Sequence, residues 1–256
     1  MPKVSIVIPC YNSEKTIRRS IESIANQTWR DFETVVIDNN CTDSTLEVLS
    51  EYTAVANIRI VNCITQGIVP ALNTGIYNSD SAYIARQDDD DYWYPDKLQK
   101  QMAFLESNPK IGILGTQIRL LDENGTPQDL GTYKRPVKYP LSDDQIRYMM
   151  VIGQNPLCHP SVIMKREVPL KAGCYSDHFH LAEDLHLWLK AFPWFKFANL
   201  EETLVDYTQT IREDYNPRIV KALSTMYFNL YKEAGIISGD RPNILYEWEL
   251  ENSKNG

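Results

Sequence analysis

Short apolar runs rich in β-branched residues alternate with amphipathic stretches over the first hundred residues. Apolar runs at 4–8, 34–37 and 58–61, and a fourth beginning at 82, predict buried strands. Between them, apolar residues recur at helical spacing, which predicts one helix capped by Ser13, one capped by Asp43 or Ser44, and one beginning near Pro70. This alternation predicts an α/β fold with a mostly parallel sheet and right-handed crossovers.

The pattern changes after residue 107. A strand at 111–114, a hairpin turn at Asn124 and Gly125, and a long loop or lid over 126–140 are expected. Ser142 begins a capping box, a strand follows at 162–164, and a helix is expected at 182–192. The last predicted helix ends at Gly235, and its expected core stripe is Ile219, Leu223, Met226, Tyr227 and Leu230.

Composition narrows the functional classes. The chain has 256 residues, 43% of them hydrophobic, and a formal net charge of −8, which argues against nucleic-acid binding. Five scattered cysteines form no Cys-x-x-Cys pair, so a reducing compartment is expected. We find no signal-peptide pattern and no apolar run long enough to span a bilayer, so a soluble protein is expected.

Four consecutive aspartates, at 88–91, follow the strand that begins near residue 82. Like charges in a row are tolerated in a solvated turn or where a cation neutralises them, and Mg²⁺ and Mn²⁺ prefer carboxylate oxygen. An acidic solvated loop is the alternative interpretation. The position favours the metal, because the run precedes Pro95 and a helix carrying Leu98, Met102 and Leu105, and open α/β sheets bind ligands where strands end.

The first strand is followed by neither a G-x-G-x-x-G fingerprint nor a P-loop, which disfavours dinucleotide oxidoreductases and P-loop NTPases. Two acidic strand ends are present instead, at Asp38 and at 88–91. They are expected on one edge of the sheet, where one side could hold a nucleoside and the other a metal-bound diphosphate.

At this point several ordered motifs resemble glycosyltransferase family 2. They are VSIVIPCYN at 4–12, SIANQTW at 23–29, ALNTG at 71–75, YIARQDDDD at 83–91, HPSV at 159–162, AEDLHLWLK at 182–190 and LVDY at 204–207. The resemblance covers roughly the first 210 residues. It implies a GT-A fold, with a nucleotide-sugar half at 1–107, an acceptor half at 108–210 and a helical extension at 211–256, and it implies inverting sugar transfer.

The resemblance also implies roles for individual residues. Asp90 and Asp88 fall on the family's metal-binding D-x-D motif, with Mn²⁺ or Mg²⁺ as cofactor, and Asp184, beside Glu183, falls on the catalytic base. The nucleotide-binding residues would be Pro9, Tyr11, Asn12, Asp38, Asn39, Asp88 and Asp89. Contacts to acceptor or phosphate would come from Asp91, Trp93, His159 and Lys190; packing is the alternative for Trp93, and a structural role is the alternative for His159.

Asn39 departs from the family pattern, which usually has aspartate there to accept from the uracil imide. An amide oxygen can also accept, so a UDP-sugar stays open and GDP- or dTDP-sugars gain weight. The acceptor would be a glycan or a lipid-linked saccharide, reached from the cytoplasm at the inner face of the membrane by peripheral association. Two other functions stay open: a nucleotide-binding or docking module without catalysis, and a sugar nucleotidyltransferase.

Overall fold

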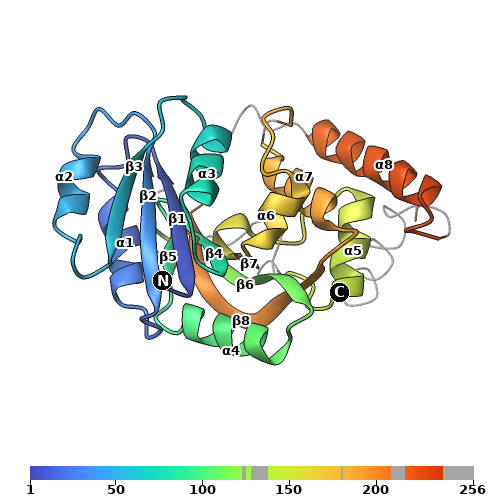
Figure 1. The fold of residues 1–256 in the computed structure, drawn as a ribbon, viewed down its shortest axis with the longest axis horizontal. Coiled ribbons are helices and arrows are strands. Elements are labelled where there is room, and N and C mark those ends of the chain that lie inside the picture. The colour runs from blue at the N-terminus through green and yellow to red at the C-terminus, as the bar shows by residue number, and fades with distance from the viewer. Residues whose placement is uncertain (123–124, 128–137, 180, 209–216, 239–256) are drawn as a thin grey trace.

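A computed structural model describes residues 1–122, 125–127, 138–179, 181–208 and 217–238. Within these residues one sheet has the strand order β3-β2-β1-β4-β7-β6-β8-β5 (Figure 1). Its strands are β1 (Val4–Cys10), β2 (Phe32–Asp38), β3 (Ile58–Asn62), β4 (Tyr83–Arg86), β5 (Tyr92–Trp93), β6 (Ile111–Leu121), β7 (Ile163–Lys165) and β8 (Lys196–Thr208). The helices are α1 (Ile17–Ala25), α2 (Thr45–Ser50), α3 (Ile68–Tyr77), α4 (Lys97–Ser107), α5 (Asp143–Ile152), α6 (Glu167–Ala172), α7 (Glu183–Ala191) and α8 (Pro217–Glu233), with a 3-10 turn at His159–Ser161.

The first half of the sheet is parallel, as the sequence pattern predicts. β1 pairs with β2 and with β4, and β2 pairs with β3, all in parallel. All seven residues of β1 are buried because helices cover both faces, α1 on one side and α3 on the other (Figure 1). The chain leaves β1 towards β3 and returns to β4 on the other side of β1, so the strand order reverses between β1 and β4.

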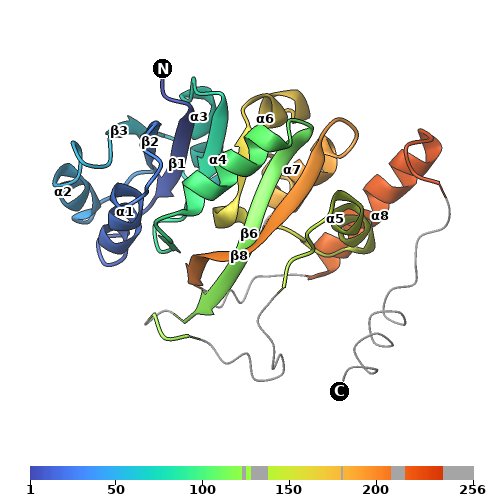
Figure 2. The ribbon, with the colours of Figure 1, turned by 90° about the horizontal axis from the view of Figure 1, so that it is seen from below.

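The second half mixes directions. β7 is inserted antiparallel between β4 and β6, and β6 pairs in parallel with β8. These two long strands lie side by side beneath α4 (Figure 2). The end of β8 returns to the first half, because it pairs antiparallel with β5 directly after the four aspartates.

The helix expected from Pro95 is confirmed as α4, with Leu98, Met102 and Leu105 buried, but it begins at Lys97, so Pro95 lies before its first turn. The Ser142 cap of the expected capping box is also confirmed, since its side chain accepts from the Gln145 backbone N–H at the start of α5. The cap expected from Ser13 is wrong. α1 begins with Thr16 as its N-cap and without a side-chain cap hydrogen bond.

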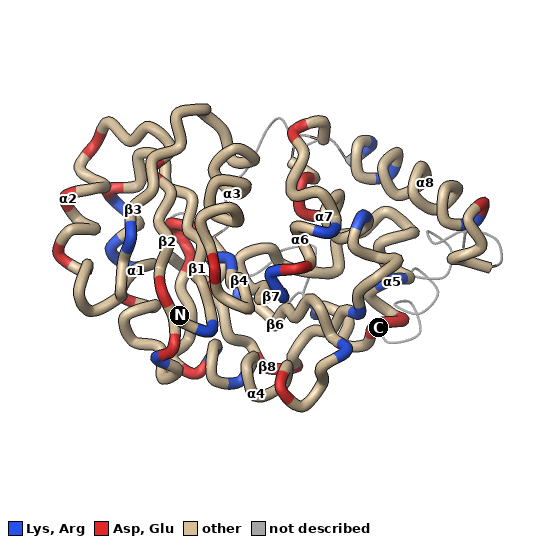
Figure 3. The backbone as a smooth tube through the Cα atoms, viewed as in Figure 1, with Lys and Arg blue, Asp and Glu red and all other residues tan. Residues whose placement is uncertain are grey.

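The predicted stripe of α8 is correct only in part. Leu223 is buried, and Ile219 and Tyr227 pack against the core, whereas Met226 and Leu230 are exposed. Val220, Phe228 and Tyr231 complete the buried face. Basic residues lie near both ends of this helix, and Lys and Arg elsewhere are distributed over many elements (Figure 3). Among the described residues, no helix combines the length and apolarity needed to cross a membrane.

Part of the predicted turn after β6 is present. Leu121 forms an antiparallel bridge with Pro127, and Gly125 has a φ of 76°, a left-handed value that favours glycine. Asn124, most of the expected 126–140 loop and the expected boundary at residue 210 lie outside the described residues.

Candidate functional site

The predicted site residues gather where β1, β2 and β4 end. The register aligns Cys10 at the end of β1 with Asp38 at the end of β2, and β4 ends two residues before Asp88. Tyr11 follows β1 and is 55% exposed, and the Asn12 side chain accepts from the backbone N–H of Thr42. The expectation that Asp38 and the aspartates share one edge of the sheet is confirmed.

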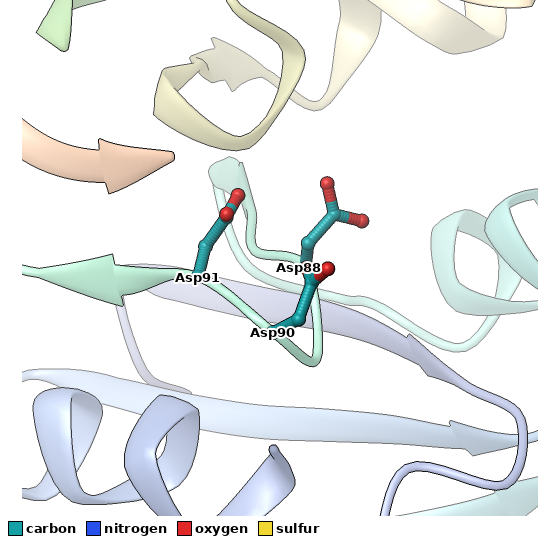
Figure 4. Close-up of side chains that lie close together, drawn as sticks. All are labelled: Asp88, Asp90 and Asp91. Atoms are coloured by element: carbon teal, nitrogen blue, oxygen red, sulfur yellow. The ribbon is translucent and has the colours of Figure 1, made fainter. Parts of the chain in front are cut away.

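Three of the four consecutive aspartates form a cluster. One carboxylate oxygen each of Asp88, Asp90 and Asp91 lies within 4.8 Å of the others, and the three side chains rise from the turn between β4 and β5 (Figure 4). The turn is held from below, because Ser20 of α1 donates to the Asp88 carbonyl (2.8 Å) and Gln87 Nε2 donates to the Asp91 carbonyl (3.1 Å). Sequence reasoning placed Asp91 with acceptor or phosphate; the structure groups it with the two predicted metal ligands.

The electrostatics of this cluster fit a cation. Burial and the neighbouring carboxylates raise the pKa of Asp90 to about 7 and the pKa of Asp91 well above its ordinary value. Asp91 Oδ2 is buried and has no hydrogen-bond partner among the described residues. Three convergent carboxylates, one with an unsatisfied oxygen, are a ligand set that Mg²⁺ or Mn²⁺ accepts.

Asp89 turns away from the cluster. Its carboxylate accepts from the Ser13 hydroxyl and from the Tyr11 backbone N–H, and burial raises its pKa to about 6. Asp89 was expected among the nucleotide-binding residues. Its side chain instead braces the loop after β1, so Ser13 stabilises the site rather than capping α1.

The Asn39 side chain is also hydrogen-bonded within the protein. Its amide nitrogen donates to the carbonyls of Cys63 (3.2 Å) and Thr65 (2.8 Å), and its oxygen accepts from the Gly67 N–H (2.8 Å). Its side chain is 3% exposed. Asn39 therefore joins the end of β2 to the loop that leads into α3. Asp38 next to it accepts from the Cys41 N–H (2.9 Å).

The predicted base, Asp184, lies in the first turn of α7. Its Oδ2 accepts from Asn155 Nδ2 (2.6 Å), and its Oδ1 accepts from the Leu185 backbone N–H (2.6 Å). Burial, and then the charge of neighbouring Glu183, raise the pKa of Asp184 to about 7. A carboxylate with this pKa can both hold and release a proton near neutral pH.

The charge of Arg86 acts on both the cluster and Asp184. It is 5% exposed, its guanidinium pairs with Asp88, and its charge lowers the pKa of Asp90 and of Asp184 against the effect of burial. The charge of one buried cation therefore reaches both the cluster after β4 and the carboxylate on α7. Arg86 lies within the motif at 83–91, but the sequence alone predicts no role for it.

Three residues that were expected to contact acceptor or phosphate are engaged within the protein. Trp93 is fully buried and donates its ring N–H to the Pro160 carbonyl (2.9 Å), so its ring belongs to the core. Lys190 Nζ donates to the Cys174 carbonyl (2.6 Å), just after the end of α6, so its ammonium group is hydrogen-bonded within the protein.

His159 is 9% exposed, lies 2.8 Å from the Tyr175 hydroxyl through Nε2, and has a pKa lowered well below 6.5 by burial. A neutral, buried imidazole supports the structural alternative.

Besides Arg86, the sequence did not indicate Asn155 and Thr208 as residues of the site. The Thr208 N–H donates to Asp91 Oδ1 (2.7 Å), and its hydroxyl donates to the Asp90 carbonyl (2.8 Å). No local signal marks either residue, since each meets its partner across the fold.

A sheet whose order reverses beside a carboxylate cluster, with a further buried carboxylate on a helix of the second half, is the arrangement of the GT-A glycosyltransferases. Two solved structures of that fold resemble the chain. S. aureus TarS (residues 1–349) in complex with UDP-GlcNAc is 20% identical with a TM-score of 0.66, covering 90% of this chain and 73% of TarS. Mannosyltransferase PcManGT from Pyrobaculum calidifontis, in complex with GDP-Man and Mn²⁺, is 16% identical with a TM-score of 0.63. The match covers 94% of this chain and 66% of PcManGT.

Sequence comparison gives the family. Residues 5–167 match the model of Glycosyl transferase family 2, and the chain belongs to that family and is a glycosyltransferase. EpsE of Bacillus subtilis (strain 168), named as a glycosyltransferase, is 33% identical over 221 residues, 83% of this chain and 74% of EpsE. WbnJ of Escherichia coli, named as an O-antigen biosynthesis glycosyltransferase, is 31% identical over 210 residues, which are 80% of this chain and 78% of WbnJ. This chain covers 43% of the length of a longer crystal structure of TarS.

Proposed function

We propose that the protein transfers a sugar from a nucleotide-sugar donor to a hydroxyl of a glycan or lipid-linked acceptor, with inversion at the anomeric carbon. The observation that carries this proposal is the pair of carboxylate groups around Arg86: the cluster of Asp88, Asp90 and Asp91 on the donor side and Asp184 on α7. Inverting transfer needs one group that favours departure of the diphosphate and one that takes the acceptor proton.

In the proposed step the acceptor oxygen attacks the anomeric carbon. The bond from that carbon to the phosphate oxygen breaks, and its electron pair leaves with the nucleoside diphosphate. Asp184 takes the hydroxyl proton, a role that contributes roughly 10²–10⁴-fold to the rate. Its pKa of about 7 suits a base that must be ionised before attack and protonated after it.

Asp90 and Asp88, with Asp91 beside them, are the residues that would hold a divalent ion. Bound Mn²⁺ or Mg²⁺ would neutralise negative charge that develops on the leaving diphosphate. The nucleoside would lie towards Pro9, Tyr11, Asn12 and Asp38, along the ends of β1 and β2. Asn39 would support this region from beneath, since its side chain is engaged with three backbone groups.

The donor class and the acceptor class rest on the relatives. The two fold neighbours are complexes with UDP-GlcNAc and GDP-Man, and WbnJ is named for O-antigen biosynthesis. We therefore propose a UDP-, GDP- or dTDP-sugar as donor and a growing polysaccharide as acceptor.

The test combines binding with turnover. Thermal unfolding with UDP, GDP, dTDP and CMP, each with Mn²⁺ and with EDTA, should give a metal-dependent increase for one nucleotide, since a ligand at 100 times its Kd adds about 2.7 kcal/mol of stability. Release of that nucleotide from its sugar conjugate should fall roughly 10²–10⁴-fold in Asp184→Asn. Asp90→Asn should lose the metal-dependent shift.

Asp80→Asn, whose side chain is 79% exposed, is the matched control and should behave as the parent protein. Full turnover in both Asp90→Asn and Asp184→Asn would refute the proposal. No shift with any nucleotide would favour the alternative of a docking module without catalysis.

A further inference from the structure

Asn155 meets Asp184 although 28 residues separate the two. Its Nδ2 donates to Asp184 Oδ2 over 2.6 Å, a short contact of the kind that charged acceptors form. The other carboxylate oxygen already accepts from the Leu185 backbone N–H. The carboxylate is thus fixed at both oxygens, and each oxygen keeps lone pairs that can accept from a substrate hydroxyl.

The segment that carries Asn155 is itself held in place. Pro156 follows it, which restricts the Asn155 backbone to extended conformations. The Asn155 side-chain oxygen accepts from the Leu157 N–H (3.4 Å), and Leu157 is 1% exposed in the core. The Pro156 carbonyl accepts from Asn199 of β8 (3.1 Å), so the segment is attached to the sheet. The amide nitrogen therefore reaches Asp184 from a rigid support.

We infer that Asn155 is a positioning residue that orients the Asp184 carboxylate towards the acceptor hydroxyl and stabilises its ionised form through an uncharged donor. This inference rests on the proposed function, in which Asp184 is the base. An uncharged donor suits the task, because a cation in this place would hold the proton-accepting oxygen more tightly and weaken its basicity.

Other groups face Asp184 from the surrounding elements. Glu183 of α7 raises its pKa, and Arg86 of β4 lowers it. Tyr175, after α6, and Tyr139, before α5, lie near enough for the Asp184 charge to raise their own pKa values. All four remain in a variant of Asn155, so a change in the Asp184 titration reports the lost amide.

The experiment compares Asn155→Ala and the near-isosteric Asn155→Asp with the parent protein, and uses Gln154→Ala as the neighbouring control. The acid limb of the pH dependence of kcat/KM should move up by about 1–2 pH units in Asn155→Ala, the equivalent of one hydrogen bond to a charged group. It should move further in Asn155→Asp, where a second carboxylate faces the first. Gln154→Ala should leave the limb in place.

A purely structural role predicts something different, namely an equal loss of activity at every pH with the limb unmoved, and that result would overturn the inference. Titration of the Asp184 carboxyl carbon by NMR, assigned by its loss in Asp184→Asn, gives a second readout that needs no turnover. An unchanged midpoint in both Asn155 variants would likewise overturn it. Full activity of Asp184→Asn would refute the proposed base instead, so the two failures can be told apart.

Discussion

Replacing Arg86 by methionine removes the buried cation that faces both carboxylate groups. Arg86 is 5% exposed and pairs with Asp88. Two unit charges about 4 Å apart interact by about 4 kcal/mol at an effective dielectric constant of about 20. Loss of one partner of a buried ion pair costs about 3–5 kcal/mol. We therefore expect Arg86→Met to lower the free energy of unfolding by about 3–5 kcal/mol at pH 8 in EDTA.

The loss should be smaller at pH 5, and the sign follows from the carboxylates. Asp90 and Asp184 have folded pKa values of about 7, above the value of about 3.9 for an unfolded aspartate. Such groups favour the folded state fully below the unfolded pKa, and this contribution is lost as the pH rises through the folded pKa. At pH 5 both are protonated with or without Arg86. At pH 8 they are ionised, and the arginine charge no longer offsets the repulsion of Asp90 by Asp88 and Asp89 and of Asp184 by Glu183.

Urea denaturation followed by tryptophan fluorescence, at pH 5 and pH 8 in EDTA, measures both values. Arg59→Met is the control, because Arg59 is 46% exposed in its pair with Glu33 and should change stability by at most about 1 kcal/mol. A loss below about 1 kcal/mol in Arg86→Met at pH 8, or an equal loss at both pH values, would refute the reasoning.

Two further substitutions test buried polar groups. Asn39→Asp replaces an amide nitrogen that donates to two backbone carbonyls with an oxygen that repels them. We therefore expect the free energy of unfolding to fall by about 1–3 kcal/mol and calorimetry to show weaker UDP binding. Tighter UDP binding at an unchanged free energy of unfolding would contradict this. Lys97 is fully buried against Gln101, and burial lowers its pKa well below 10.5. Between the folded pKa and about 10.4, Lys97 is protonated in the unfolded chain and neutral in the folded protein. The free energy of unfolding therefore rises by up to about 1.4 kcal/mol for each unit by which the pH increases in this range. Lys97→Met should lose that slope in urea denaturation between pH 7 and 10, and equal slopes would show that the lysine is charged.

The parallel half of the fold could be predicted because its signals are local. Each strand of that half is a short apolar run, and the stripe of Leu98, Met102 and Leu105 has the period of one helix face. The position of the carboxylates followed from the same logic, since 88–91 come directly after a strand. The insertion of β7 between β4 and β6 could not be predicted, because antiparallel pairing of segments some 80 residues apart leaves no trace in local periodicity.

Side-chain roles within the site were harder to predict than its position. The sequence shows four identical aspartates, and only the path of the turn directs Asp89 to Ser13 and the other three towards one another. Trp93 looked available for stacking, yet the pairing of β5 with β8 buries it. Lys190 matched a position expected near phosphate, and its actual partner is a carbonyl 16 residues earlier in the chain. Each error concerns a tertiary contact that a motif does not encode.

Thr208 limits how segments of this enzyme can be exchanged with those of a relative. It lies at the far end of β8, yet it is bonded to both Asp90 and Asp91, so the carboxylate turn is completed by a residue more than a hundred positions downstream. The segment 5–167, over which the family is recognised, contains neither Thr208 nor Asp184. A chimera joined near residue 107 would therefore have to match the incoming carboxylate turn to the resident end of β8, because Thr208 is bonded to both Asp90 and Asp91.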